Sequence, residues 1–244
     1  MASKKPLQVG VLVADSVQLL DMACVDLLNM ATPEYLTAAG LPSPMVELGR
    51  PCDFYYISTS GSGTLQESTA NIAIRITHSI EDEVVAPGKL DVLIIPGPDP
   101  RNTPSEEVQK FVREHNEAKT TIFAICTGVL LSGHCGILKG KHVTGPRALI
   151  PSLRKKFPEA AKWDDTTRVV HDGNLWTSGG VTNGNDLIAT YLKETYPGPV
   201  AQTVCAMAEV GDRPLKYKTG PTRSFLFFVW QFLKAFPASW FQRK

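Results

Sequence analysis

Short apolar runs alternate along the chain with stretches of helical spacing. Residues 92–95, Val-Leu-Ile-Ile, are apolar at every position, which is typical of a central parallel strand covered on both faces. A second buried strand is predicted at 121–125, directly before Cys126. The remaining predicted strands are 7–13, 55–60, 72–76, and short ones near 142–144, 168–170 and 175–177.

Helical spacing of apolar residues fills the intervals between these strands. The predicted helices are 22–30, 105–116 with Ser105 as N-cap, 127–133 and 185–194, whereas 32–52, rich in Pro and Gly, is predicted to be a loop. Strands that alternate with helices favour an α/β fold with a doubly wound, mostly parallel sheet. We therefore expect a flavodoxin-like or Rossmann-like three-layer sandwich.

The domain organisation follows from length and from the composition of the tail. With 244 residues the chain suits one α/β domain, which we place at 1–219. Residues 220–244 form an aromatic extension, predicted to be a helix that packs on the domain or on a second subunit. A contact with a membrane surface or another partner is the alternative.

Charge and cysteine content narrow the classes of function. The formal net charge is +1, so no overall field attracts nucleic acid. The five cysteines form no disulfide framework and no paired metal motif. The sequence contains no phosphate loop or nucleotide fingerprint, no apolar run long enough for a membrane span and no apolar signal segment. We expect a cytoplasmic protein without a metal or cofactor.

Cys126 is the residue whose position most strongly suggests chemistry. It lies between a buried strand and a helix, at the edge of the sheet where sites of open α/β proteins collect. Gly128 permits close packing at such a turn, and the helix N-terminus is expected to lower the pKa of the thiol. The alternative is that Cys126 is a small buried apolar residue.

Several ordered motifs resemble one family. Residues 124–128, Ala-Ile-Cys-Thr-Gly, resemble the cysteine elbow of the ThiJ/PfpI superfamily, which has a class I glutamine amidotransferase-like fold. Further similar stretches are 17–21, 92–97, 136–141 and 172–180, so the resemblance spans about residues 7–195. Gln18 and Asp21, followed later by Cys-Thr-Gly, look most like the isonitrile hydratase branch.

The resemblance implies a small electrophilic substrate, a homodimer and specific roles for three residues. Cys126 would attack an isonitrile carbon, Asp21 would act as acid and base, and Thr127 would supply a backbone N–H and a hydroxyl, so that hydration releases an N-substituted formamide. A carboxyl beside a thiolate in a dry pocket should have a raised pKa. A structural role for Asp21 is N-cap of the helix that begins at Met22, which is compatible with the acid and base role.

Two departures from the family pattern bear on the pocket. The family commonly has Gly-Gly where this chain has Gly97-Pro98, and proline has no N–H for an oxyanion. Candidates for the pocket and the oxyanion are therefore Gly97, Asp99 and Gly128, although Asp99 also suits a turn residue. The second departure is at residues 143–147, which differ from the corresponding stretch of the isonitrile hydratase branch. Arg147, the last of these residues, either meets an anionic group of the substrate or is a surface residue.

Other functions of the superfamily remain as alternatives. Peptidase-like members place His after the cysteine, where this chain has Thr127, and neither His134 nor His171 matches a family motif. Glyoxalase-like activity in the superfamily relies on a set of Cys, His and Glu, which is incomplete in this chain. A redox sensor or stress-response protein requires only an oxidisable cysteine.

Overall fold

A seven-stranded sheet forms the centre of the molecule. The computed structural model describes residues 4–241, with the strands in the order β10-β11-β7-β6-β1-β2-β5. All neighbouring strands pair in parallel except β10, which is antiparallel to β11. The strands of this sheet are β1 Leu7–Leu12, β2 Cys52–Ser58, β5 His78–Ser79, β6 Val92–Ile95, β7 Thr121–Ala124, β10 Val169–Asp172 and β11 Leu175–Ser178.

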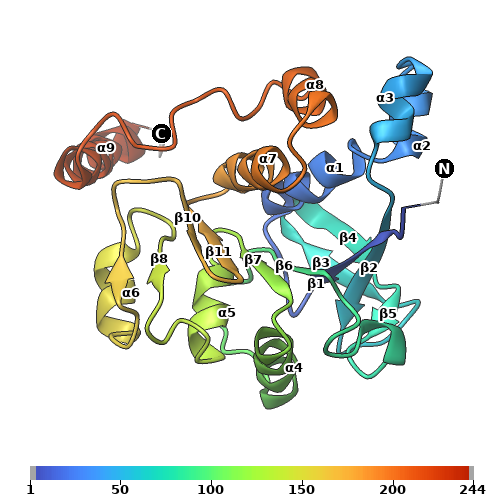
Figure 1. Cartoon of the computed structure of the whole chain (residues 1–244). Helices are drawn as coiled ribbons and strands as arrows, with labels where there is room; N and C mark the ends of the chain where they lie inside the picture. The colour runs from blue at the N-terminus through green and yellow to red at the C-terminus, as the bar shows by residue number, and fades with distance from the viewer. Residues whose placement is uncertain (1–3, 242–244) are drawn as a thin grey trace.

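Helices cover both faces of the sheet and complete three layers (Figure 1). The helices are α1 Ala23–Asn29, α2 Pro33–Ala38, α3 Ser43–Leu48, α4 Glu106–Glu117, α5 Gly128–His134, α6 Ile150–Lys156, α7 Asn183–Thr195, α8 Pro199–Met207 and α9 Pro221–Phe241. Alternate residues of β6 enter two separate cores. Val92 and Ile94 pack on the α1 and α7 side, and Leu93 and Ile95 pack on the α4 and α5 side.

The predicted fold class is confirmed, and most predicted strands are in place. Ser105 caps α4, accepting a hydrogen bond from the Val108 N–H at 3.4 Å. The loop predicted at 32–52 is wrong, because it contains α2 and α3. Both helices are only six residues long and begin at or beside a proline. The prolines that suggest a loop in the sequence therefore mark the starts of two helices. Two small sheets stand apart, β3 Leu65–Ser68 with β4 Ile72–Arg75, and β8 His142–Val143 with β9 Lys162–Trp163.

The aromatic extension forms the predicted helix over residues 221–241, but most of its described apolar side chains are not buried against this chain. Phe225 is 66% exposed and Trp230 is 58% exposed. Figure 1 shows α9 at the rim of the molecule, joined to α8 by a long connection. Within the described residues, no helix combines the length and apolarity that crossing a bilayer requires.

Candidate active site

Cys126 occupies a strained turn between β7 and α5. Its φ angle is +53°, a value that residues with a side chain rarely adopt. The turn brings the first residue of α5 against β6, where a Cβ on Gly128 would lie 2.2 Å from the Ile95 carbonyl oxygen. Glycine is therefore required at 128, and the predicted elbow is present. Cys126 is only 8% exposed in this single chain.

Asp21 lies in a short 3₁₀ turn, Leu19–Met22, between β1 and α1, and is fully buried. Its Oδ2 accepts a hydrogen bond from the Gly97 N–H at 2.9 Å. A Cβ at Gly97 would approach Asp21 Oδ2 and Thr127 Oγ1 to 2.5 Å each. The helix beginning at Ala23 has no side-chain cap, so the N-cap interpretation of Asp21 is wrong. Gly97 instead anchors the Asp21 carboxyl with its amide.

The Asp21 carboxyl and the Cys126 thiol interact in this buried space. Burial raises the pKa of Asp21 to about 7, although hydrogen bonds from Gly97 and Cys126 oppose the shift. The second oxygen, Oδ1, is buried and makes no hydrogen bond of ordinary geometry within the described residues. Gly97 thus holds one oxygen of the carboxyl, and no described donor of ordinary geometry holds the other.

The predicted lowering of the Cys126 pKa is wrong. Burial, and then the neighbouring Asp21 charge, raise the pKa of the thiol to about 11. The N–H groups of Val181 and Thr127 favour the thiolate, but they do not outweigh desolvation. At neutral pH the sulfur is therefore a thiol that needs a base when it reacts.

Val181 is a site residue that the sequence did not reveal. Its backbone N–H lies within hydrogen-bonding reach of the Cys126 sulfur, and its φ angle is +44°. That angle is a strained conformation for a β-branched residue. The preceding Gly179-Gly180 turn is the only signal in the sequence.

Thr127 contributes more through its backbone than through its hydroxyl. The hydroxyl donates to the Pro98 carbonyl oxygen at 2.8 Å. Because it has one proton, it can only accept a hydrogen bond from the Cys126 thiol. The Thr127 N–H, like that of Val181, favours the thiolate form of Cys126.

Asp99 behaves as the turn residue considered above. Its Oδ1 accepts from the Arg101 backbone N–H at 2.9 Å, and its carboxylate pairs with the Arg101 guanidinium. These hydrogen bonds lower the pKa of Asp99 to about 2. Asp99 lines a cavity of about 150 Å³ between the Pro98 turn and α5, whose lining does not include Cys126.

Residues 212–219 hold the turn that carries Val181. Tyr217 lies between the guanidinium groups of Arg147 and Arg168, at 4.4 and 4.5 Å from its ring centre. Its hydroxyl accepts from Asn183 Nδ2 at 3.2 Å. Arg147 also donates to the carbonyl oxygen of Asp165. It is therefore a clamp for this segment, and its donors are directed at protein groups.

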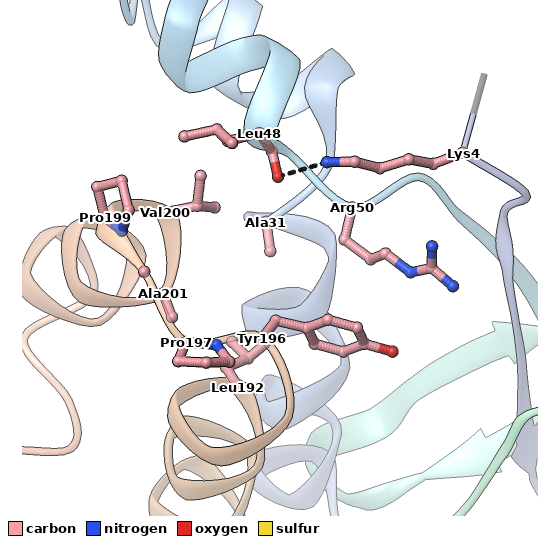
Figure 2. A pocket seen from close by; sticks show the side chains of 11 residues that line it. Lys4, Ala31, Leu48, Arg50, Leu192, Tyr196, Pro197, Pro199, Val200 and Ala201 are labelled. Carbon is pink, nitrogen blue, oxygen red and sulfur yellow. Dashed lines mark hydrogen bonds between the residues drawn. The ribbon is translucent and has the colours of Figure 1, made fainter. Parts of the chain in front are cut away.

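A larger cavity of about 460 Å³ lies at the opposite edge of the sheet, near the starts of β1 and β2 (Figure 2). Lys4 closes one side by donating to the Leu48 carbonyl oxygen at 3.0 Å, and Arg50 lies over the Tyr196 ring. Among the described residues, no group of three His, Cys, Asp or Glu side chains is arranged to hold a metal ion.

Comparison with known sequences shows the family of this chain. Residues 12–194 match the DJ-1/PfpI family. The chain is 31% identical over 213 residues to the isonitrile hydratase of Pseudomonas putida, an alignment that covers 85% of this chain and 80% of that protein.

Solved structures show the same fold at lower identity. Drosophila melanogaster DJ-1beta is 20% identical, with a TM-score of 0.64, and the match covers 84% of this chain and 99% of the other. An AraC family transcriptional regulator from Pseudomonas putida is 13% identical, with a TM-score of 0.66 and coverages of 83% and 100%. With the cysteine elbow in place and three quarters of the sequence matched, the chain belongs to the DJ-1/PfpI family.

Proposed function

We propose that this protein is a cysteine-dependent enzyme that hydrates isonitriles to N-substituted formamides. The observation that carries the proposal is the buried pair of Asp21 and Cys126, in which Asp21 has a pKa of about 7 and a free oxygen, Oδ1. A carboxyl that titrates near neutral pH can give and take protons in one reaction cycle. The similarity to the Pseudomonas putida isonitrile hydratase supports this chemistry.

The first half of the reaction forms a bond between Cys126 and the substrate. Asp21 donates its proton to the terminal carbon of R–N≡C, and the Cys126 sulfur bonds to the same carbon. The thiol proton passes to the Asp21 carboxylate, which restores the acid. The product of this half is a thioimidate, R–N=CH–S, attached to the enzyme, and the N–H groups of Val181 and Thr127 stabilise negative charge on the sulfur as it reacts.

The second half adds water and releases the enzyme. Asp21 donates a proton to the nitrogen and accepts one from water, whose oxygen bonds to the carbon. The C–S bond then breaks, the remaining hydroxyl proton returns to sulfur through Asp21, and R–NH–CHO leaves. Atoms balance as one isonitrile plus one water, and no oxidant or reductant is needed.

The shape of the site suits such a substrate. Cys126 is 8% exposed, so only a slender group can approach its sulfur in this chain. The terminal carbon of an isonitrile carries no substituent and lies on a linear axis, whereas an acyl carbon is flanked by two groups. The Gly97 amide is already bound to Asp21, and Pro98 has no N–H, which further disfavours reactions that need a conventional oxyanion hole.

The alternatives receive less support from the same geometry. A redox sensor works through a thiolate, yet burial and Asp21 raise the pKa of Cys126 to about 11. Glyoxalase-like chemistry would use a histidine. Within the described structure, His134 packs on Phe157 and His171 stacks on Trp176, and neither is a hydrogen-bond partner of Cys126.

The test is formamide production from cyclohexyl isonitrile by the purified 244-residue chain, measured by chromatography and mass spectrometry. We expect turnover by the wild type, incorporation of ¹⁸O from labelled water, and an adduct of the intact isonitrile on Cys126 after rapid quenching. Cys126→Ala should abolish turnover, and Asp21→Asn should lower kcat by about two orders of magnitude or more because the proton donor is lost.

Cys52→Ser is the matched control, because Cys52 is a half-buried free cysteine in β2 outside the site. It should keep wild-type turnover. Equal formamide production by wild type and Cys126→Ala would refute the mechanism. A folded wild type that produces no formamide from alkyl or aryl isonitriles would refute the proposed function.

A further inference from the structure

Helix α9 carries an unusually large exposed apolar surface. Seven large apolar side chains among its described residues are between 45% and 66% exposed. They are Phe225, Leu226, Phe227, Phe228, Trp230, Phe232 and Leu233. Contiguous apolar surfaces of this kind mark contacts with other molecules or with membranes. Neither the family match over residues 12–194 nor the active site accounts for this helix.

The base of α9 is firmly held, so the helix is a presented surface rather than a loose tail. Leu215 accepts a backbone hydrogen bond from Arg168, and Tyr217 donates one to Thr166. Arg147 donates to Ser224 Oγ at 3.0 Å, inside the first turn of α9. Ser224 and Gln231 are seven residues apart and share one face, and both are half-buried. The polar face is thus the more covered one, while the apolar residues are open.

Charge indicates what would cover this surface. After Asp212 the chain contains seven Lys and Arg residues and no Asp or Glu, although the net charge of the whole protein is only +1. Four of these cations are exposed, and none of the four forms an ion pair within the described structure; they are Lys216, Lys218, Arg223 and Lys234. Lys234 lies over the Trp230 ring at 5.6 Å.

A second copy of the chain fits this charge poorly. A symmetric dimer contact joins the same patch on both subunits, so the cations of one tail would face those of the other. An anionic lipid surface provides the complementary charge, and Phe, Leu and Trp side chains beside Lys and Arg are typical of helices that lie in the membrane interface. We propose that α9 binds the surface of anionic membranes, with its apolar side chains inserted at the boundary between headgroups and acyl chains.

Vesicle co-sedimentation of the 244-residue chain tests the proposal. We expect binding to vesicles of phosphatidylcholine mixed with phosphatidylserine, weaker binding to phosphatidylcholine alone, and loss of that preference at high salt. Phe225, Phe228 and Phe232 share one face at helical spacing. Their triple replacement by Ser should weaken binding at least about tenfold, since apolar burial drives insertion. The fluorescence of Trp230 should shift to the blue when vesicles are added.

Two controls separate the helix from general stickiness. Leu65→Ser removes an apolar side chain that is 67% exposed in β3, and Lys110→Gln removes an exposed cation on α4. Both should leave vesicle binding unchanged. The proposal is overturned if the wild type does not bind anionic vesicles. If sedimentation velocity then also shows that the triple Ser variant dissociates a dimer, the apolar surface of α9 is a contact between subunits instead.

Discussion

At the scale of single residues, burial makes ionisation of Asp21 and of Cys126 costly, and the charge of an ionised Asp21 adds to the cost for Cys126. Both are buried, and the first negative charge to form in their shared space opposes a second. The pair therefore titrates in two steps, near pH 7 on the carboxyl and near pH 11 on the thiol. At neutral pH the Asp21 carboxyl is partly protonated and the Cys126 thiol is uncharged. Such a pair is suited to a reaction that begins with proton donation.

Asp21 should make the protein less stable as pH rises towards 7. The native carboxyl keeps its proton up to pH about 7, whereas an unfolded Asp loses it near pH ~3.9. Between these values the native state binds more protons, so the free energy of unfolding falls as pH increases. At 1.36 kcal/mol per unit the fall attributable to Asp21 is about 4 kcal/mol at most.

Urea unfolding of wild type and Asp21→Asn between pH ~4 and ~8 measures this effect as the difference between their slopes. The Asn variant cannot ionise, so it should gain stability relative to wild type as pH rises. Asp26→Asn, on the exposed face of α1, should keep the wild-type slope. Parallel curves for wild type and Asp21→Asn would contradict the raised pKa.

The same carboxyl should set the pH dependence of turnover. Because the proposed first step uses protonated Asp21, kcat/KM for an isonitrile should be constant below pH about 7 and fall about tenfold per unit above it. The measurement is kcat/KM from pH 5 to 9 in buffers of constant ionic strength. A profile that stays flat to pH 9 would show that the reaction starts instead from the proton of the Cys126 thiol.

At the scale of elements, the elbow depends on contacts that only glycine permits. An added Cβ at Gly128 would meet the backbone of β6 at 2.2 Å, so α5 would have to move away from the sheet. We expect Gly128→Ala to lower the free energy of unfolding by about 2–4 kcal/mol, as overpacking against backbone does. Urea denaturation provides the value.

Gly180→Ala is the control for this substitution. A Cβ at Gly180 would have no atom within 4 Å, and its φ is not in the left-handed region. Its effect should lie within about 1 kcal/mol of zero. Equal destabilisation by the two alanines would mean that lost backbone freedom, and not the contact with Ile95, explains the glycine at 128.

The same elements show which parts of the structure a sequence can predict. Strand β6 was predicted with its correct bounds because Val-Leu-Ile-Ile admits burial on both faces, and the elbow followed from a strand that runs directly into a helix. The sequence does not predict Val181 as a site residue, because β-branched residues rarely adopt a positive φ angle and nothing local indicates one here. The Cys126 pKa was predicted in the wrong direction because the helix dipole is local, whereas burial and the approach of Asp21 arise from tertiary packing.

At the scale of the whole molecule, the segment before α9 links the C-terminal part of the chain to the turn that carries Val181. The Arg213 Nε donates to both oxygens of Asp186 at 2.9 and 2.8 Å, and its second nitrogen group donates to the Thr182 carbonyl and to Asn183. Thr182 and Asn183 directly follow Val181, whose amide favours the thiolate of Cys126, and Asp186 lies one turn further along α7. These contacts of Arg213, called the Arg213 clamp below, therefore couple the position of residues 212–219 to the geometry around the Cys126 sulfur.

Removing Arg213 should weaken both stability and catalysis. Asp186 is 2% exposed, so Arg213→Ala leaves a buried carboxylate without its cation, and we expect a loss of about 2–3 kcal/mol in urea unfolding, the Arg being partly exposed. Turnover should fall because the Val181 turn loosens.

In the double variant with Asp186→Ala, the stability loss should be smaller than the sum of the single losses, since the unpaired charge is also removed. Lys110→Ala, which breaks an exposed pair on α4, should change neither quantity. Additive losses in the double variant would show that Arg213 acts through packing alone, and wild-type turnover in Arg213→Ala would separate the Arg213 clamp from the active site.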